Sequence, residues 1–184
     1  MKKLVILSAV AAGLVAVFVL GPMAVAGGGK QHVSAKDGLG GYLEPPSIST
    51  TGTGTFEATI DDQAETITWK LSYANLDSPD PPLQAHVHFG QRSVNGGISF
   101  FLCANPPIVP PAGTQPCPAP PATISGTATA ASIIGPLGQG IEPGSFDEIV
   151  AAIRAGRTYA NVHSVRFPGG EIRGQINDSN QRDN

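Results

Sequence analysis

The sequence is poor in charged residues, in aromatic residues and in histidine, and it contains only two cysteines among 184 residues. Its arginines and lysines form no cluster, and the formal net charge is −3. A negative net charge without a basic cluster makes nucleic acid and anionic membrane surfaces poor partners. The chain also lacks a nucleophile elbow, a phosphate-binding glycine loop and a regularly spaced calcium loop. We therefore assign no catalytic residue and do not expect a hydrolase.

The N-terminal residues have the pattern of a secretory signal peptide. Met1-Lys2-Lys3 is followed by an uncharged run, 4–20, and by the small-x-small site Ala24-Val25-Ala26. This pattern predicts a signal peptide over 1–26 that is cleaved after Ala26. An uncleaved membrane anchor is the alternative, because the apolar run is near the lower length limit for spanning a bilayer. Cleavage predicts a secreted or periplasmic protein without a membrane contact, acting on an unknown protein or cell-envelope partner.

The two cysteines, Cys103 and Cys117, both follow the signal segment. Exported chains meet an oxidising compartment, so a disulfide between them is the expected state. The intervening residues are rich in proline, which predicts an irregular loop rather than a strand. A thiolate metal site is the disfavoured alternative, because no C-x-x-C motif is present.

Hydrophobic alternation predicts an all-β fold. We expect a flexible lead-in over 27–39, one β domain over 40–177 and a polar tail over 178–184. Short alternating or continuously apolar runs separated by turn residues are typical of strands. Such runs occur at 53–60, 66–73, 83–89, 98–102, 122–130, 158–163 and 171–176, of which 98–102 is the continuously apolar one. Many short strands favour an antiparallel β-sandwich of Greek-key type. One short helix is inserted before the last hairpin.

That helix is predicted over 146–155. Apolar residues recur there at helical spacing, and Gly156 is a natural stop. Ser145 and Glu148 have the S-x-x-E spacing of a capping box, in which each side chain binds the other residue's backbone N–H.

Three of the four histidines fall in predicted strands. His86 and His88 are two residues apart, so both side chains lie on one face of a strand. His163 ends another strand, whose Tyr159 and Asn161 share its face. Imidazoles bind zinc and copper, and three of them can form an open mononuclear site. Packed structural histidines are the competing interpretation. His32 lies in the lead-in, and we expect it to be disordered.

The last predicted strand places Glu171, Arg173 and Gln175 on one face, after the turn residues Gly169-Gly170. One interpretation is that the carboxylate and the guanidinium, together with Asn161, orient the histidines through hydrogen bonds. The other, which we favour from sequence, is a cross-strand ion pair on a solvent-exposed face.

Four segments together resemble the CHRD domain, a module first described in chordin and also present in bacterial exported proteins. They are Gly41-Tyr42-Leu43-Glu44-Pro45-Pro46 with Gly52-Thr53-Gly54-Thr55-Phe56, Gln84-Ala85-His86-Val87-His88-Phe89-Gly90 with Gly96-Gly97-Ile98, Ala155-Gly156-Arg157-Thr158-Tyr159-Ala160-Asn161-Val162-His163, and Pro168-Gly169-Gly170-Glu171-Ile172-Arg173-Gly174-Gln175.

The resemblance implies an antiparallel β-sandwich and a shared role for His86, His88 and His163, either structural or metal-binding. A weaker similarity links His86-Val87-His88-Phe89-Gly90 to the copper-ligand strand of copper/zinc superoxide dismutase. The full dinuclear site of that enzyme needs more histidines than this chain has. The leading hypothesis is thus a non-enzymatic binding or structural module. The second is a mononuclear copper or zinc protein, with redox chemistry as one use.

Overall fold

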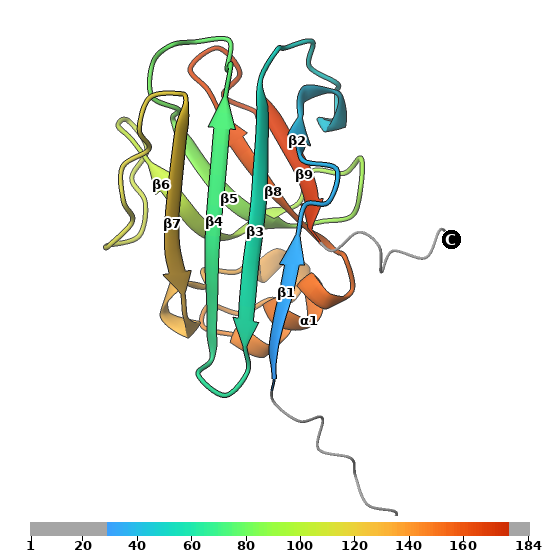
Figure 1. The fold of residues 1–184 in the computed structure, drawn as a ribbon. Coiled ribbons are helices and arrows are strands. Elements are labelled where there is room, and N and C mark those ends of the chain that lie inside the picture. The colour runs from blue at the N-terminus through green and yellow to red at the C-terminus, as the bar shows by residue number, and fades with distance from the viewer. Residues whose placement is uncertain (1–28, 177–184) are drawn as a thin grey trace, which may run out of the picture.

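Nine strands form a single antiparallel sheet in the computed structural model, which describes residues 29–176 (Figure 1). The strands are β1 (Lys30–Ser34), β2 (Leu39–Gly40), β3 (Thr53–Asp61), β4 (Thr66–Ala74), β5 (Gln84–Phe89), β6 (Gly97–Ala104), β7 (Ala122–Ala128), β8 (Thr158–His163) and β9 (Ile172–Ile176). The helix α1 (Phe146–Arg154) and three single-turn 3₁₀ helices, η1 (Gly41–Leu43), η2 (Ala130–Ser132) and η3 (Leu137–Gln139), complete the fold. The prediction of an all-β antiparallel fold with one helix before the last hairpin is confirmed.

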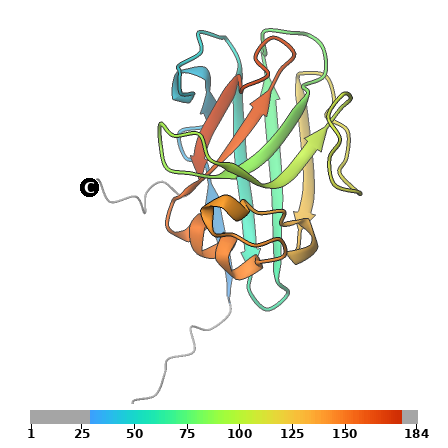
Figure 2. The ribbon, with the colours of Figure 1, turned by 180° about the vertical axis from the view of Figure 1, so that it is seen from behind.

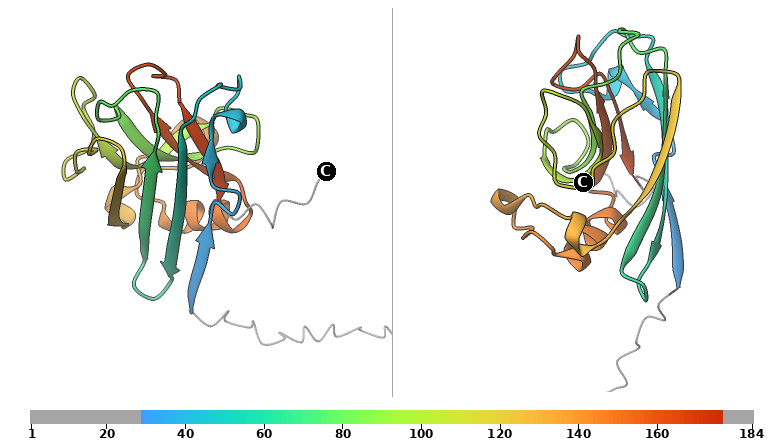
Figure 3. Two further views of the ribbon diagram at one scale, coloured as in Figure 1. Left: turned by 45° about the horizontal axis from the view of Figure 1, so that its top comes forward. Right: turned by 90° about the vertical axis from the view of Figure 1, so that its left-hand side faces the viewer.

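The sheet bends into two facing layers, which Figure 3 shows edge-on. Strands β1, β3, β4 and β7 form one layer, β6, β5, β8 and β9 form the other, and β2 joins them by pairing with both β3 and β9. The path of paired strands ends at β6 and β7, which do not pair with each other, and β1 lies off this path and pairs with β3 alone. The side-chain amide of Gln115 donates to the carbonyl of Leu102 in β6 at 3.3 Å and to that of Ser125 in β7 at 3.0 Å. This contact bridges the gap, so the sheet is a nearly closed barrel.

The hydrophobic core fills the space between the layers. In β4, the predicted inward residues Ile67, Trp69, Leu71 and Tyr73 are all at least 95% buried. They meet the inward face of β3 in register, with Phe56 opposite Leu71. The alternation predicted from sequence therefore assigns the correct faces, because a strand points successive side chains to opposite sides.

Helix α1 covers one end of the barrel with its apolar stripe, as predicted, and its five inward residues are buried. The predicted capping box is wrong. Ser145 is the N-cap residue, but its side chain makes no capping hydrogen bond, and its ψ of 76° departs from the extended conformation of ordinary N-caps. With nine residues, α1 is too short to cross a bilayer, and nowhere else in residues 29–176 is there a helix long and apolar enough to do so.

The expectation of a flexible lead-in over 27–39 is wrong for the part that the structure describes. Strand β1 pairs with β3 over its whole length, and Val33 is buried against the core. His32 lies on the exposed side of β1 and is therefore ordered, but it is far from the other histidines along the sheet. The predicted signal peptide, 1–26, and the polar tail, 178–184, lie outside the described residues.

The predicted disulfide between Cys103 and Cys117 is confirmed, and both residues are buried in the core. It anchors the proline-rich loop to β6, next to the Gln115 bridge. The loop is irregular, as predicted, with no strand between β6 and β7.

Replacing both cysteines by alanine should lower the free energy of unfolding by about 3 kcal/mol, because the bridge closes a loop with a sequence separation of 14 residues. For a domain of this size that loss corresponds to a fall in Tm of about 10 °C, measurable by calorimetry. Reductant should lower the Tm of the parent chain and leave that of the variant unchanged. Equal Tm values for parent and variant under oxidising conditions would contradict the prediction.

Candidate metal centre

His86 and His88 lie on the outward face of β5, where they alternate with the core residues Ala85 and Val87. Both faces of this strand are buried, so its outward face is not exposed to solvent. The exposed fractions of the two histidines are 1% and 7%. The strand alternation predicted from sequence is confirmed, and the burial of its polar face is a result of the tertiary structure.

The pairing of β5 with β8 brings His163 to the same place. His163 lies opposite Gln84, and Asn161 lies opposite His86, so His163 is diagonal to His86 across the two strands. The ring centroids of His86 and His163 are 4.6 Å apart. One ring nitrogen from each of the three histidines lies within 4.8 Å of the others. The structure thus brings together all three residues that the sequence proposed.

Three segments bury this outward polar face. They are the β5–β6 loop (90–96), the η1 segment (41–50) and the β8–β9 loop (164–171), which Figure 2 shows from the side of β5, β8 and β9. The segments also bind each other, since the side-chain amide of Asn95 donates to the carbonyl of Pro45 at 3.2 Å. Alternation along a strand cannot predict such a cover, because it depends on where distant loops fold.

Hydrogen bonds to backbone carbonyls fix two of the imidazoles. Nδ1 of His88 lies 2.9 Å from the carbonyl oxygen of Gly96, and Nδ1 of His163 lies 3.0 Å from that of Pro168. A carbonyl oxygen can only accept, so each Nδ1 carries the proton and each Nε2 keeps its lone pair. Histidine ligands of metals are commonly oriented in this way.

His86 completes the chain of hydrogen bonds. Its Nδ1 lies 2.9 Å from Nε2 of His88, which is already the accepting nitrogen, so Nδ1 of His86 is the donor. Nε2 of His86 and Nε2 of His163 are then buried acceptors, and neither has a hydrogen-bond partner within residues 29–176. Unpaired buried polar atoms cost free energy, and a bound ion would compensate them.

Burial keeps all three imidazoles neutral. It lowers the pKa of His88 to about 4 and that of His163 to about 4. The pKa of His86 falls well below its usual value, first through burial and then through the neighbouring His163 and His88. Metals bind the neutral imidazole, so these residues are ready to act as ligands without first losing a proton.

The spacing fits one ion after a small adjustment. Two nitrogens bound at the usual distance to one zinc or copper ion are at most about 4.2 Å apart. The outermost separation of 4.8 Å therefore has to shorten by roughly half an ångström or more when an ion binds. Coordination by His88 would break its hydrogen bond with His86, because Nε2 of His88 is the acceptor in that bond.

A second layer of aromatic and cationic groups supports the histidines. The ring of Tyr159 stacks on that of His88 with centroids 4.7 Å apart and an interplanar angle of 4°. The guanidinium of Arg173 lies over the other side of Tyr159, 3.4 Å from the ring centroid. Phe101 packs edge-on against His86 at 4.9 Å. Sequence reasoning placed Tyr159 on this face but gave it no role, and it missed Phe101.

The solvent-exposed ion pair favoured from sequence is wrong. Glu171, Arg173 and Gln175 are at least 94% buried, and Glu171 and Arg173 do not pair with each other. Gln175 donates to the carbonyls of Gly90 and Gly156 at 2.8 and 2.9 Å, which holds the start of the β5–β6 loop. The polar side chains of this strand face form hydrogen bonds with the covering loops instead of with solvent.

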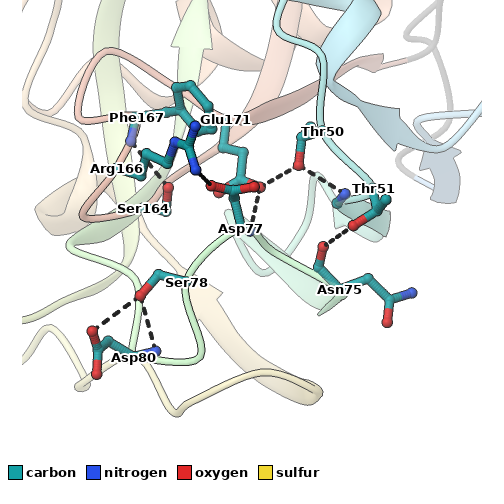
Figure 4. A network of polar contacts seen from close by, with 11 residues as sticks. Thr50, Thr51, Asn75, Asp77, Ser78, Asp80, Ser164, Arg166, Phe167 and Glu171 are labelled. Carbon is teal, nitrogen blue, oxygen red and sulfur yellow. Dashed lines mark hydrogen bonds and ion pairs between the residues drawn. The ribbon is translucent and has the colours of Figure 1, made fainter.

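Glu171 acts on the loops and does not touch the histidines. Its Oε1 accepts from the hydroxyl of Thr50 at 2.6 Å and from the backbone N–H of Asp77 at 2.8 Å (Figure 4). Asp77 in turn pairs with Arg166 of the β8–β9 loop at 2.6 Å. Glu171 therefore ties together the η1 segment, the β4–β5 loop and the loop whose Pro168 holds His163.

Asn161 also helps to hold the η1 segment over the polar strand face. Its side-chain amide donates to Oε1 of Glu44 at 2.6 Å and to the carbonyl of Ile172 at 2.9 Å. Burial raises the pKa of Glu44 to about 7, although the Asn161 hydrogen bond and the charge of Arg173 act in the opposite direction. Sequence reasoning missed Glu44, because it lies in an irregular segment more than 100 residues from its partner.

Comparison with known proteins agrees with this picture. The model of the CHRD domain family matches residues 29–176, which is most of the chain. Neither the curated proteins nor the solved structures gave a match. The matched range contains the whole sheet, the helix and the three histidines. The chain therefore belongs to the CHRD domain family.

Proposed function

We infer that this CHRD domain binds one copper or zinc ion through His86, His88 and His163. The observation that carries this proposal is the state of the three rings. They are buried and neutral, two of them are oriented by backbone carbonyls, and buried ring nitrogens are left without partners. Histidines that serve packing alone do not need to leave acceptors unsatisfied in a buried site.

The ligand set also limits the chemistry. Three imidazoles suit zinc and copper better than calcium or magnesium, which prefer oxygen ligands. Phe101, Tyr159 and the three loops keep water from most of the site. Metal binding is compatible with the predicted export of the chain. Redox chemistry of the superoxide-dismutase type and the non-enzymatic binding of an envelope partner remain predictions from sequence.

Metal titration of the chain from residue 27 onward tests the proposal. We expect one equivalent of zinc or copper to bind and to survive gel filtration, as measured by elemental analysis. The His86→Ala/His88→Ala variant should retain none, because a single imidazole cannot hold the ion. Binding should also raise the Tm of the parent chain, since the ion adds its affinity to the stability of the folded state.

The His32→Ala variant is the matched control, because His32 is an exposed histidine of β1 outside the cluster. It should bind metal like the parent chain. Circular dichroism of each metal-free variant checks that the fold is intact. A folded parent chain that binds neither metal, or a double variant that binds as well as the parent, would refute the proposal.

A further inference from the structure

The η1 segment and the β5–β6 loop enclose a pocket of about 300 Å³ on the far side of Tyr159 from the histidines. Arg173 and Glu44 contribute to its wall, and Tyr42, Leu43 and Pro45 contribute apolar surface. The stacked Tyr159 ring lies between Arg173 and His88, so this pocket is distinct from the candidate metal centre.

Arg173 is the unusual member of this pocket. Its side chain is 98% buried, and it forms no ion pair with any carboxylate in the part of the chain that the structure describes. Its hydrogen bonds go to the carbonyl of Val94 at 3.0 Å and to the side-chain oxygen of Asn95 at 3.4 Å. A guanidinium has five donors, so these two contacts leave donating capacity on a group that also lines a pocket.

A buried cation without an anionic partner is costly, and proteins normally pair such groups. The Tyr159 ring compensates part of the cost through its π face. Glu44 lines the same pocket but provides little more, because burial raises its pKa to about 7 and leaves it substantially protonated at neutral pH. The pocket therefore has a net need for negative charge.

We propose that this pocket binds a small carboxylate with an apolar body, held by the buried guanidinium of Arg173. The planar fork of a guanidinium matches a carboxylate in a two-point hydrogen bond. Leu43, Pro45 and the exposed ring of Tyr42 offer contacts to the rest of the ligand. Arg92 also lines the pocket, but it is exposed and already pairs with Asp37 at 3.4 Å. One buried cation beside Glu44 therefore suits a single negative charge better than a doubly charged phosphate or sulfate. This inference does not depend on the metal proposal.

Benzoate is the probe, and it is titrated into the metal-free chain from residue 27 onward in the presence of a chelator, by calorimetry and by NMR. We expect saturable binding, with phosphate and sulfate at least tenfold weaker. The Arg173→Gln variant should bind benzoate at least tenfold more weakly. The Lys70→Gln variant is the matched control, because Lys70 is an exposed cation of β4 outside this pocket, and it should bind like the parent chain.

A second variant covers the case in which Arg173→Gln does not fold. Ser47 is exposed at the pocket wall, so Ser47→Trp should block the pocket and weaken benzoate binding at least tenfold without removing a buried group. Failure of the parent chain to bind benzoate, or undiminished binding in either pocket variant when folded, would overturn the proposal. Binding of phosphate or sulfate as tight as that of benzoate would overturn the assignment of a carboxylate ligand.

Discussion

The metal-free domain should lose stability steeply as the pH falls from 6.5 to 4. Burial lowers the pKa of His88 and of His163 to about 4 and lowers that of His86 well below its usual value, whereas the usual imidazole pKa in an unfolded chain is near 6.5. Within this window the three imidazoles bind protons in the unfolded state but remain neutral in the folded state, so acid favours unfolding. Above pH 6.5 both states are neutral at these residues and the effect disappears.

The size of the effect follows from the pKa differences. Each unit is equivalent to about 1.4 kcal/mol, so His88 and His163 each destabilise the fold by on the order of 3 kcal/mol at pH 4. Glu44 opposes this trend, because its raised pKa of about 7 makes the folded state bind a proton that the unfolded state releases above its usual value of 4.5. The three histidines outweigh one carboxyl group. Since small domains are stable by about 5–15 kcal/mol, unfolding should be extensive near pH 4.

Urea unfolding at a series of pH values measures this dependence, with the fluorescence of the single tryptophan, Trp69, as the signal. The His88→Gln/His163→Gln variant should show a much flatter profile between pH 4 and 6.5, because two of the titrating groups are absent. The His32→Gln variant should retain the steep profile. A steep profile in the double variant would show that other groups cause the acid sensitivity.

Acid should also release the metal near pH 4, at the lower end of this window. Protons and the ion compete for the same nitrogens, so the apparent metal affinity falls once the imidazoles begin to protonate.

Substitution of Gly96 by alanine should have the second large effect, on stability and on metal binding together. A Cβ at this position would overlap the carbonyl group of Phe89 across the β5–β6 turn. The carbonyl oxygen and carbon of Phe89 are backbone atoms that cannot rotate away, so the loop has to move. Gly96 also positions two side chains of the candidate metal centre. Its carbonyl accepts from His88, and its N–H donates to the hydroxyl of Tyr159 at 3.0 Å.

We expect Gly96→Ala to lower the free energy of unfolding by about 3 kcal/mol, at the upper end of what an overpacked site costs. Metal affinity should fall at least tenfold, because His88 loses the carbonyl that orients it. Calorimetric titration and thermal melts measure the two effects.

Gly169→Ala is the matched control. Gly169 lies in the β8–β9 loop that also covers the histidines, but a Cβ there would meet no atom within 4 Å. Its Tm and its metal affinity should stay close to those of the parent chain. A Gly96→Ala variant with parent-like affinity would mean that the Gly96 carbonyl does not position His88.

The sequence alone determined most of the strands and the helix of this domain. Alternation in β3 and β4 marked the inward residues correctly, because burial on one face of a strand imposes a period of two residues. It also placed His86 and His88 on one face and identified His163 as their partner. Local patterns sufficed for the strands and for the His86–His88 pair, since each depends on residues close together in the chain, whereas the pairing of β5 with β8 brings in His163. The export segment and the tail remain predictions.

Only the tertiary structure decided what the polar strand face does. The sequence predicted that the side chains of Glu171 and Arg173 are exposed to solvent, because alternation with core residues is the signature of a half-exposed strand. The same alternation describes a face covered by loops, and the cover comes from segments distant in sequence, such as Glu44 against Asn161. Strand β1 was missed for the same reason, since its order comes from pairing with β3 and not from its own glycine-rich surroundings. Burial by distant loops made the histidines neutral and left Arg173 unpaired, so it created both candidate sites.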